Sequence, residues 1–279
     1  MILPSPAASF EWVQTPFGPA LVCRTLQPIA PHLFTTRQWQ LGLPATERGG
    51  EASWNEVARA LDVEPDRLMR VRQVHGAGVV MAREPVDVQL DADIIVSHDR
   101  AIALAIRAAD CVPLLMADRR TGAVAAAHAG WRGLAGRVPA VAVAALEREC
   151  GSRPADLIAA AGPSIGACCY EVGPDVREGF ARAGFSVADL DRWFLRAPVS
   201  TPANRSMPHV EAKRHAGHWF FDGWASTRDQ LTSAGLPAAQ IFIAETCTAS
   251  HPDTFCSYRR DGASAGRLAG GIRRAAYRP

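Results

Sequence analysis

The sequence has no hydrophobic run long enough to cross a membrane and no strong excess of charge of either sign. Its longest apolar stretch, around VPAVAVAAL, is far shorter than the roughly 18 residues that indicate a membrane-spanning helix. Lysine and arginine number 30 against 28 acidic residues, so we expect neither a nucleic-acid nor a membrane partner. The first residues, MILPSPAASFEW, lack a basic segment followed by an apolar one, and we therefore expect no signal peptide.

The cysteines lack the even number and regular spacing of a disulfide framework. There are seven, and they are Cys23, Cys111, Cys150, Cys168, Cys169, Cys247 and Cys256. Their irregular placement and the adjacent pair favour reduced thiols, which are typical of a cytoplasmic protein. The H-x-H motifs that commonly supply paired imidazoles in multicopper oxidases are also missing, although the chain contains eight histidines.

Short apolar runs bounded by turn residues predict a chain rich in strands. We expect extended segments at Arg70–Val74, Val79–Ala82, Ile94–Ser97, Ile102–Ile106, Val112–Ala117, Ala123–His128, Leu157–Ala161, Gln240–Ala244 and Phe255–Tyr258. Helices are predicted over Trp54–Leu61, Gly133–Cys150, Val176–Ala183 and Trp224–Ala234. A capping box of Ser53 and Glu56 is expected to begin the first helix, and Asp222 to cap the last.

The order of these elements predicts the fold class. Strands and helices are mixed without the regular alternation of a doubly wound sheet, so we expect an α+β or layered α/β fold with mixed sheets. The Pro-, Ser- and Asn-rich segment Leu195–His209 is predicted to be a loop within one domain, because too little chain follows it for a second domain. We therefore treat residues 1–279 as a single domain.

Two of the predicted strands place a cysteine and a histidine together. The segment DRRTG is a favourable turn, and a hairpin that pairs Asp118 with Ala123 puts His128 opposite Pro113. Cys111 lies two residues from Pro113, and therefore on the same face as His128, one diagonal step away. A shift of one residue would separate the two side chains onto opposite faces. The simplest register thus predicts a thiol beside an imidazole at the mouth of the hairpin.

His75, in the segment RQVHGAG, is a third candidate ligand. It ends a predicted strand and enters a glycine-rich turn, where an imidazole can face a cavity. One cysteine and two histidines form a three-ligand zinc set with an open fourth position, which is the pattern of catalytic zinc sites. The same set can also bind copper in vitro.

These segments resemble the laccase-domain, YfiH-type family of purine nucleoside phosphorylases, formerly described as multicopper polyphenol oxidases. The matching segments are FTTR (Phe34–Arg37), QVHG (Gln73–Gly76), Ala109–Asp118, Ala125–Gly133, Gly162–Gly173 and Cys256–Gly262. The resemblance implies a layered α-β-β-α sandwich, and it places the family's metal ligands and catalytic centre on His75, Cys111 and His128. The segment Gln38–Gly50 departs from the family by being shorter than the corresponding loop.

The resemblance also implies an activity. It predicts zinc-dependent phosphorolysis of adenosine, inosine, guanosine and methylthioadenosine, with some adenosine deamination. Purine nucleosides and phosphate are the implied ligands, and the sequence leaves the oligomeric state open. Phosphate requires a positively charged site, for which Arg37, Arg132 and Arg259 are candidates by residue type and motif position. Gln73 is the fourth residue that we predict to bind substrate.

Other activities remain open on the residues alone. GPSIG, residues 162–166, matches a hydrolase nucleophile motif, but the residues after Ser164 do not favour the helix that this motif needs. A metal-free hydrolase or deamidase would use Cys111 as nucleophile and His128 as base, with no need for His75. A copper-dependent polyphenol oxidase and a nucleoside-binding protein without activity are further alternatives. His215 and His218 have helical ligand spacing, but their polar surroundings favour a solvated loop.

Overall fold

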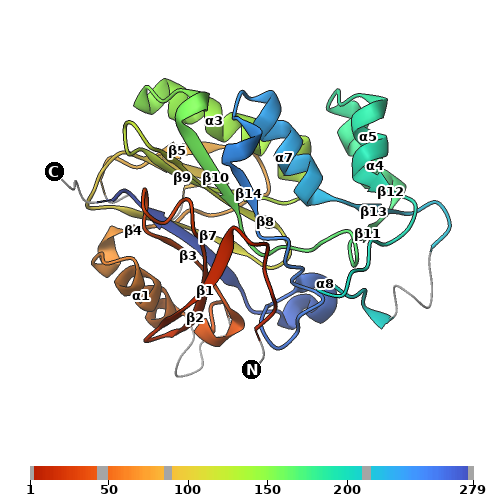
Figure 1. The fold of residues 1–279 in the computed structure, drawn as a ribbon, viewed down its shortest axis with the longest axis horizontal. Helices are drawn as coiled ribbons and strands as arrows, with labels where there is room; N and C mark the ends of the chain where they lie inside the picture. Colours follow the sequence, from red (N-terminus) through yellow and green to blue (C-terminus); the bar gives the residue numbers. More distant parts are fainter. Residues whose placement is uncertain (1–2, 43–49, 85–89, 209–214, 276–279) are drawn as a thin grey trace.

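Two six-stranded sheets form the centre of the molecule, and a small third sheet lies beside them (Figure 1). The computed structural model describes residues 3–42, 50–84, 90–208 and 215–275. In spatial order, the first sheet contains β1 (Phe10–Thr15), β2 (Gly18–Cys23), β3 (His32–Thr35), β15 (Leu268–Arg273), β7 (Ala103–Ala108) and β4 (Leu68–Met69). The second contains β14 (Ile241–Ile243), β10 (Leu157–Ala161), β8 (Val112–Asp118), β9 (Val124–Ala129), β6 (Ile94–Ser97) and β5 (Val79–Met81). The third contains β11 (Glu171–Val172), β13 (Trp219–Phe221) and β12 (Phe194–Leu195).

Both large sheets are mixed, as the sequence predicts. In the first, only β4 and β7 pair in parallel among the described strands; in the second, β5 pairs in parallel with β6 and β10 with β14. The remaining pairs of these two sheets are antiparallel, and short turns connect two of them directly, β1 with β2 and β8 with β9.

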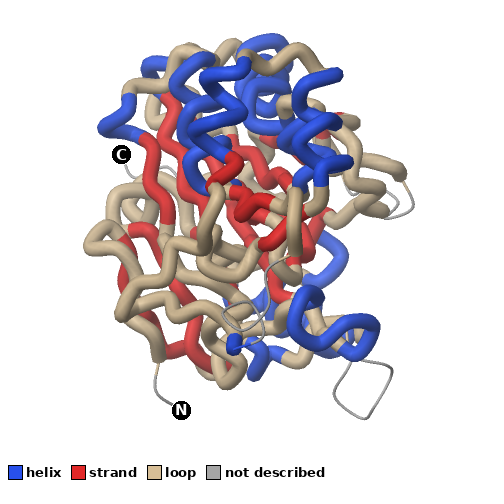
Figure 2. Tube along the Cα trace, turned by 90° about the vertical axis from the view of Figure 1, so that its right-hand side faces the viewer, coloured by secondary structure: helices blue, strands red, loops and turns tan. Residues whose placement is uncertain are grey.

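Helices cover the outer faces of the two sheets and complete an α-β-β-α sandwich. The helices are α1 (Glu51–Ala60), α2 (Trp131–Ala135), α3 (Val138–Cys150), α4 (Pro174–Arg182), α5 (Val187–Trp193), α7 (Gly223–Ser233) and α8 (Tyr258–Asp261). In Figure 1, α3 and α7 lie over the second sheet and α1 lies on the opposite side, against the first. The turned view in Figure 2 shows most of the helices gathered above the strands. The predicted sandwich is therefore confirmed.

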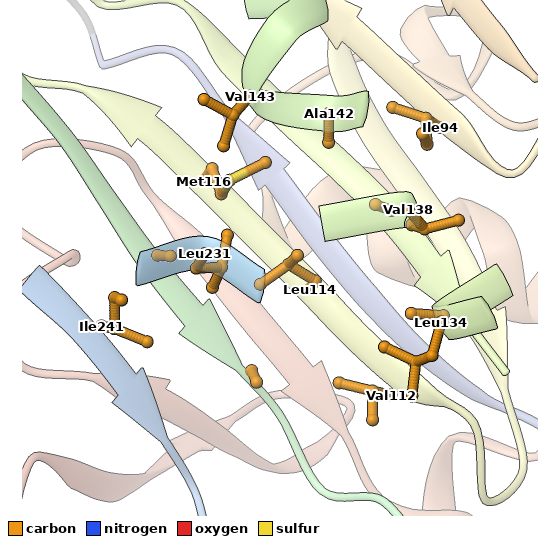
Figure 3. Packing of buried hydrophobic residues seen from close by; sticks show 14 of the residues in the cluster. Ile94, Val112, Leu114, Met116, Leu134, Val138, Ala142, Val143, Leu231 and Ile241 are labelled. Atoms are coloured by element: carbon orange, nitrogen blue, oxygen red, sulfur yellow. The ribbon is translucent and has the colours of Figure 1, made fainter. Parts of the chain in front are cut away.

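Separate apolar layers hold these elements together. Alternate residues of β8 point to opposite faces, so Leu115 packs between the two sheets, whereas Leu114 and Met116 face the helices. Val138 and Leu231 bring α3 and α7 onto that second face (Figure 3). Because β8 is buried on both faces, its sequence is an almost continuous apolar run rather than an alternating one.

The predicted hairpin is confirmed residue by residue. Pro113 lies opposite His128 and Ala117 opposite Val124, and the Asp118 N–H donates to the Ala123 carbonyl. Gly122, in the turn, has a φ of 75°, a conformation that glycine adopts without strain. This register places Cys111, directly before β8, beside His128 in β9.

Several helix predictions need correction. The predicted helix over Gly133–Cys150 is two helices, because the chain turns at Arg137, which has a φ of 60°. Pro139 lies in the first turn of α3, where a missing N–H costs nothing. The capping box at Ser53 is wrong, since α1 begins three residues earlier than predicted, with Gly50 at its N-cap. The Asp222 cap is confirmed, because its carboxylate accepts the N–H groups of Trp224 and Ala225.

Some extended segments also differ from the prediction. Regular pairing ends at Met69, so most of Arg70–Val74 is an irregular segment with one bridge from Arg72 to Asp91. Phe255–Tyr258 forms no strand, and Tyr258 begins α8. Within the predicted loop Leu195–His209, Leu195 belongs to β12, while His209 lies outside the described residues. None of the described helices is both long and apolar enough to span a membrane.

Candidate metal centre and its cavity

His75, Cys111 and His128 converge at one end of the second sheet. One ligand atom from each lies within 4.8 Å of those from the other two. His128 projects from β9, Cys111 directly precedes β8, and His75 lies in a turn with a φ of 59°. The rings of His75 and His128 meet edge to face with their centroids 4.9 Å apart. The structure therefore brings together all three residues that the sequence predicts as ligands.

Asp93, which the sequence reasoning missed, positions both histidines. Its carboxylate lies 2.8 Å from Nδ1 of His128, which leaves Nε2 directed toward the cluster. The same carboxylate accepts the backbone N–H groups of Val74, His75 and Gly76 at 2.7–3.3 Å and so fixes the turn that carries the second imidazole. A fully buried carboxylate with these partners belongs to the site, although nothing in the sequence distinguishes it from Asp91.

Gly130 allows the chain to pass directly beside the cluster. A Cβ atom at this position would lie 2.9 Å from the Cys111 Sγ and 3.2 Å from Cδ2 of His75. Both distances are shorter than ordinary contacts, so any larger residue would displace two of the three ligands. Glycine is therefore required at position 130, because the backbone there lies directly against the side chains of Cys111 and His75.

The charges of the cluster reinforce one another. Burial opposes ionisation of Cys111, but the charges and hydrogen bonds of His128 and His75 outweigh it and lower the thiol pKa to about 6. Burial disfavours the imidazolium form of His128, yet Cys111 and Asp93 raise its pKa to about 9. The cysteine is thus prepared to act as a thiolate, the form that binds metals and attacks electrophiles.

The cluster opens into a cavity of about 640 Å³ with a strongly basic lining. Four arginines, Arg107, Arg132, Arg259 and Arg267, line it together with Trp131, Tyr170 and Tyr258. Within the described ranges of the chain, none of these four guanidinium groups forms an ion pair with a carboxylate. Their uncompensated charge suits a ligand that carries an anionic group.

Two of the arginines are held in place by neighbouring groups. The half-buried carboxylate of Asp110 accepts the backbone N–H of Arg259 and the hydroxyl of Thr248, each at 2.6 Å. The Arg259 guanidinium donates to the carbonyl of Glu171 and lies 5.0 Å from the centre of the Tyr170 ring. Arg132 lies over the ring of Trp131 at 4.3 Å. Asp110, whose role the sequence leaves open, therefore anchors the segment that carries Arg259.

Gln73 and Arg107 form a hydrogen-bonded pair, of which the sequence predicted only Gln73 as a substrate-binding residue. The Gln73 amide donates to the Arg107 carbonyl and accepts its N–H, both at 2.7 Å. Gln73 therefore binds the edge of β7 and presents Arg107 to the cavity that both residues line. Burial and the nearby charges of Arg267 and Arg70 lower the pKa of Arg107, as expected where cations are crowded. A single arginine in the apolar segment IALAIRAAD was the available sequence signal.

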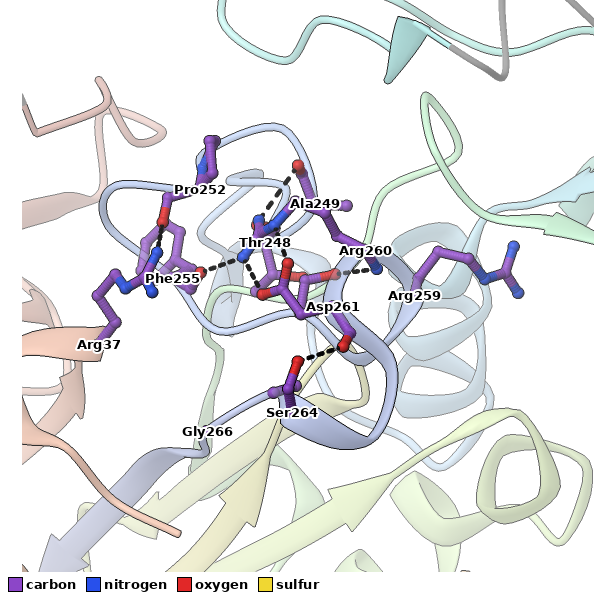
Figure 4. Close-up of polar contacts among 12 residues, drawn as sticks. Arg37, Thr248, Ala249, Pro252, Phe255, Arg259, Arg260, Asp261, Ser264 and Gly266 are labelled. Carbon is purple, nitrogen blue, oxygen red and sulfur yellow. Dashed lines mark hydrogen bonds and ion pairs between the residues drawn. The ribbon is translucent and has the colours of Figure 1, made fainter. Parts of the chain in front are cut away.

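Arg37 lies away from this cavity. Its guanidinium donates to the carbonyl of Pro252, and it lines a separate pocket with Cys256 and Arg260. Figure 4 shows Arg37 and Arg259 projecting on opposite sides of the hydrogen-bonded pair Arg260 and Asp261. The structure thus brings Arg132, Arg259 and Gln73 to the cavity but not Arg37.

Ser164 has none of the surroundings of a hydrolase nucleophile. It is fully buried, and its hydroxyl accepts the indole N–H of Trp224 at 2.7 Å. Turn residues rather than a helix follow it. The match to the hydrolase motif therefore reflects a structural turn.

Two further groups of metal-binding side chains occur among the described residues. Cys168, Cys169 and Cys247 form a buried thiol cluster. His215 and His218 both approach the carboxylate of Glu171, with Nδ1–Oε1 distances of 3.2 and 3.6 Å. The two histidines therefore do have a common partner, which the sequence reasoning did not identify.

Comparison with known proteins identifies the family. Residues 47–275 match the family described as multi-copper polyphenol oxidoreductase laccase, and the chain belongs to this family. A purine nucleoside phosphorylase of Bacteroides thetaiotaomicron is 35% identical over 64% of this chain and 60% of its own length. Adenosine deaminase RL5, from an unknown prokaryotic organism, is 34% identical over 78% of this chain and 79% of its own.

A solved structure agrees with the fold. The crystal structure of the Bacillus licheniformis protein YfiH superposes with a TM-score of 0.81 at 25% identity, covering 96% of this chain and all of that one. The chain spans less than two thirds of the Bacteroides relative but nearly four fifths of the deaminase. The sandwich and the family are thus supported by independent comparisons.

Proposed function

We propose that the protein is a zinc-dependent purine nucleoside phosphorylase that acts on adenosine, inosine, guanosine and methylthioadenosine, with adenosine deamination as a side activity. The observation that carries the proposal is the convergence of His75, Cys111 and His128 at a cavity lined by four arginines without carboxylate partners. The relatives named as a purine nucleoside phosphorylase and an adenosine deaminase support the substrate class.

The donor set fits zinc. One thiolate and two imidazoles leave a fourth position free, and the Asp93 carboxylate behind His128 is the usual partner of a metal-binding histidine. A copper ion would accept the same ligands in vitro, but one thiolate, two imidazoles and a free fourth position are the donor set of catalytic zinc sites, so we assign zinc in the cell. In such a site zinc acts as a Lewis acid toward an oxygen of the substrate or of water.

The arginines supply the phosphate site in this proposal. Arg132 and Arg259 are held by an aromatic ring and by hydrogen bonds, so little side-chain freedom is lost when an anion binds between them. Arg107 and Arg267 add charge from the first sheet. Phosphate bound here would form the bond to C1′ of the ribose as the bond to the purine nitrogen breaks, giving free base and ribose 1-phosphate.

The aromatic lining supplies a place for the base. Trp131, Tyr170 and Tyr258 border the cavity, and Tyr258 is 57% exposed, so its ring is accessible to a planar base. We assign the purine to this side of the cavity. Deamination would use water in place of phosphate, so it depends less on the arginines than phosphorolysis does.

A metal-free hydrolase is the strongest competing function. The lowered pKa of Cys111 and its contact with His128 would also suit a nucleophile and its base. His75 and Asp93 favour the metal site, because a cysteine–histidine dyad does not need a second imidazole converging on the same point. We also propose a reducing, cytoplasmic location, which the seven free thiols support.

Metal and product measurements on one preparation test the proposal. Protein purified without added metal is analysed for zinc and copper, and then incubated with inosine, with and without phosphate, while hypoxanthine release is followed. We expect close to one zinc per chain at this site and base release only with phosphate. Full activity after complete metal removal would favour the cysteine hydrolase, and absence of turnover would favour a binding protein.

A further inference from the structure

We propose that Cys168, Cys169 and Cys247 form a second metal site, separate from the first, that binds one Cu(I) ion. The three sulfur atoms lie within 4.8 Å of one another. They come from two segments far apart in sequence, the turn after β10 and the segment after β14, which a bridge between Ser164 and Cys247 holds side by side. The function proposed above requires none of these thiols.

The spacing of the sulfurs is close to that of a three-coordinate thiolate site. Metal–sulfur bonds of about 2.3 Å in a trigonal arrangement place the sulfurs about 4 Å apart. Since no two of the sulfurs are more than 4.8 Å apart, a pair at this limit would have to approach by less than 1 Å. No backbone rearrangement is therefore required to close the cluster around an ion.

The surroundings favour a soft ion with few ligands. Cys168 is 2% exposed, and Cys169 and Cys247 are fully buried, so water has little access to a fourth position. Among the described residues, no carboxylate or histidine completes this group, whereas zinc usually takes four ligands in a structural site. Thiolate-only coordination selects soft ions, and Cu(I) is the common biological ion that is stable with three such ligands.

The three sulfur atoms have polar neighbours, which cysteines that only fill space in an apolar core would not need. The Gly166 N–H donates to the Cys247 sulfur at 3.3 Å, and the Ser250 hydroxyl lies 3.5 Å from the sulfurs of both Cys168 and Cys169. The Gly166 N–H points at the Cys247 sulfur, as donors to metal-bound thiolates do, and would keep this ligand oriented.

Binding involves no change of oxidation state. Cu(I) enters as Cu(I), the sulfurs that still carry protons release them to solvent, and three copper–sulfur bonds form. The site is also connected to the first one, because Thr248, next to Cys247, donates to the carboxylate of Asp110, next to Cys111. An ion here would stiffen the segment that anchors Arg259.

Copper titration of a variant without the first site tests this proposal. In the full-length Cys111→Ala protein, Cu(I) is supplied anaerobically as a complex with a chromophoric chelator, and the copper removed from the chelator is measured. We expect one equivalent per chain, with at least a tenfold weaker affinity after a further Cys247→Ser exchange. A Cys150→Ser exchange is the matched control, because this free, half-buried thiol lies in α3, outside the cluster.

A spectroscopic measurement keeps the test independent of whether the Cys247→Ser variant folds. X-ray absorption of the copper-loaded Cys111→Ala protein should give three sulfur ligands and no nitrogen. Absence of binding in this protein, nitrogen ligation, or equal affinity in the folded Cys247→Ser variant would overturn the proposal. Zinc binding at these thiols in preference to Cu(I) would overturn the assignment of the ion. A negative result in this test would not contradict the proposed zinc site of His75, Cys111 and His128.

Discussion

The carboxylate of Asp93 lies 2.8 Å from Nδ1 of His128 and also accepts the N–H of His75, so one side chain positions both imidazoles of the candidate metal centre. Asp93 precedes β6, which pairs with β9, the strand that carries His128. Sheet pairing therefore brings the carboxylate behind the ligand. The turn of His75 is then folded around the same oxygen atoms.

Asp93→Asn should weaken metal binding without removing a ligand. Loss of the negative charge and of an acceptor leaves His128 less strongly oriented, and we expect about a 10–100-fold loss of zinc affinity. Zinc competition with a chelator measures the effect. Asp91→Asn is the matched control, because Asp91 is an exposed partner of Arg72 two residues away and should leave the affinity unchanged. Equal affinity in the Asp93→Asn and Asp91→Asn variants would contradict the role given to Asp93.

Arg132→Ala should affect phosphate more than nucleoside. The guanidinium lines the cavity without a carboxylate partner, so its removal should raise the KM for phosphate about tenfold or more, while adenosine deamination changes little. Arg37→Ala is the control, since Arg37 lies in another pocket and binds the Pro252 carbonyl. A larger effect of Arg37→Ala than of Arg132→Ala on the phosphate KM would show that the phosphate site is elsewhere.

Ser164→Ala should retain turnover and lose stability. The hydroxyl accepts the indole N–H of Trp224, and leaving that donor unpaired should cost about 1–3 kcal/mol of unfolding free energy. Denaturant unfolding and the phosphorolysis rate are measured on the same preparation. A folded variant whose rate falls more than a hundredfold would instead indicate a serine nucleophile.

His32 should make the fold sensitive to acid. Burial lowers its pKa from 6.5 to about 4, and its two nitrogens are occupied by the Cys23 N–H and the Ala30 carbonyl, which fit only the neutral ring. Below pH 6.5 the unfolded chain takes up a proton that the folded chain rejects. Stability should therefore fall as the pH decreases from about 6.5 to about 4, by about 3 kcal/mol in total.

Urea unfolding at pH 7 and pH 5 tests this expectation against His32→Gln. The variant should be less stable at pH 7, because a buried hydrogen-bonded side chain is altered. It should nevertheless lose less stability than the parent on going to pH 5. The same loss in both proteins would mean that other groups cause the acid sensitivity.

The sequence predicted the second sheet well and most of the first sheet poorly. Strands β8 and β9 are apolar runs separated by a short turn, so both their limits and their register follow from local rules. Strands β1 to β3 and β15 gave no such signal. β15, the segment LAGGIR, contains two glycines, and it becomes a strand only through pairing with β3 and β7, far away in sequence.

The residues of the candidate site also fall into two groups, those that a local pattern predicts and those that only the tertiary structure brings to the site. Cys111 and His128 were predictable because one hairpin carries both, and His75 because it stands at the start of a glycine-rich turn; the resemblance in motifs indicates the same three residues. Asp93 and Arg107 reach the site through pairing between distant segments, which no local pattern reveals. Arg37 is a motif residue of suitable type, but it lines a separate pocket on the far side of the Arg260 network, so its predicted role in phosphate binding stays a prediction from the sequence.

The proposed activity depends above all on a catalytic zinc ion held by His75, Cys111 and His128. The most direct measurement is zinc content and phosphate-dependent hypoxanthine release from inosine in the parent protein and in Cys111→Ser. The variant should lose most of its zinc and all measurable base release while its circular dichroism spectrum is unchanged. A folded Cys111→Ser protein that retains its full zinc content and its rate would contradict the account.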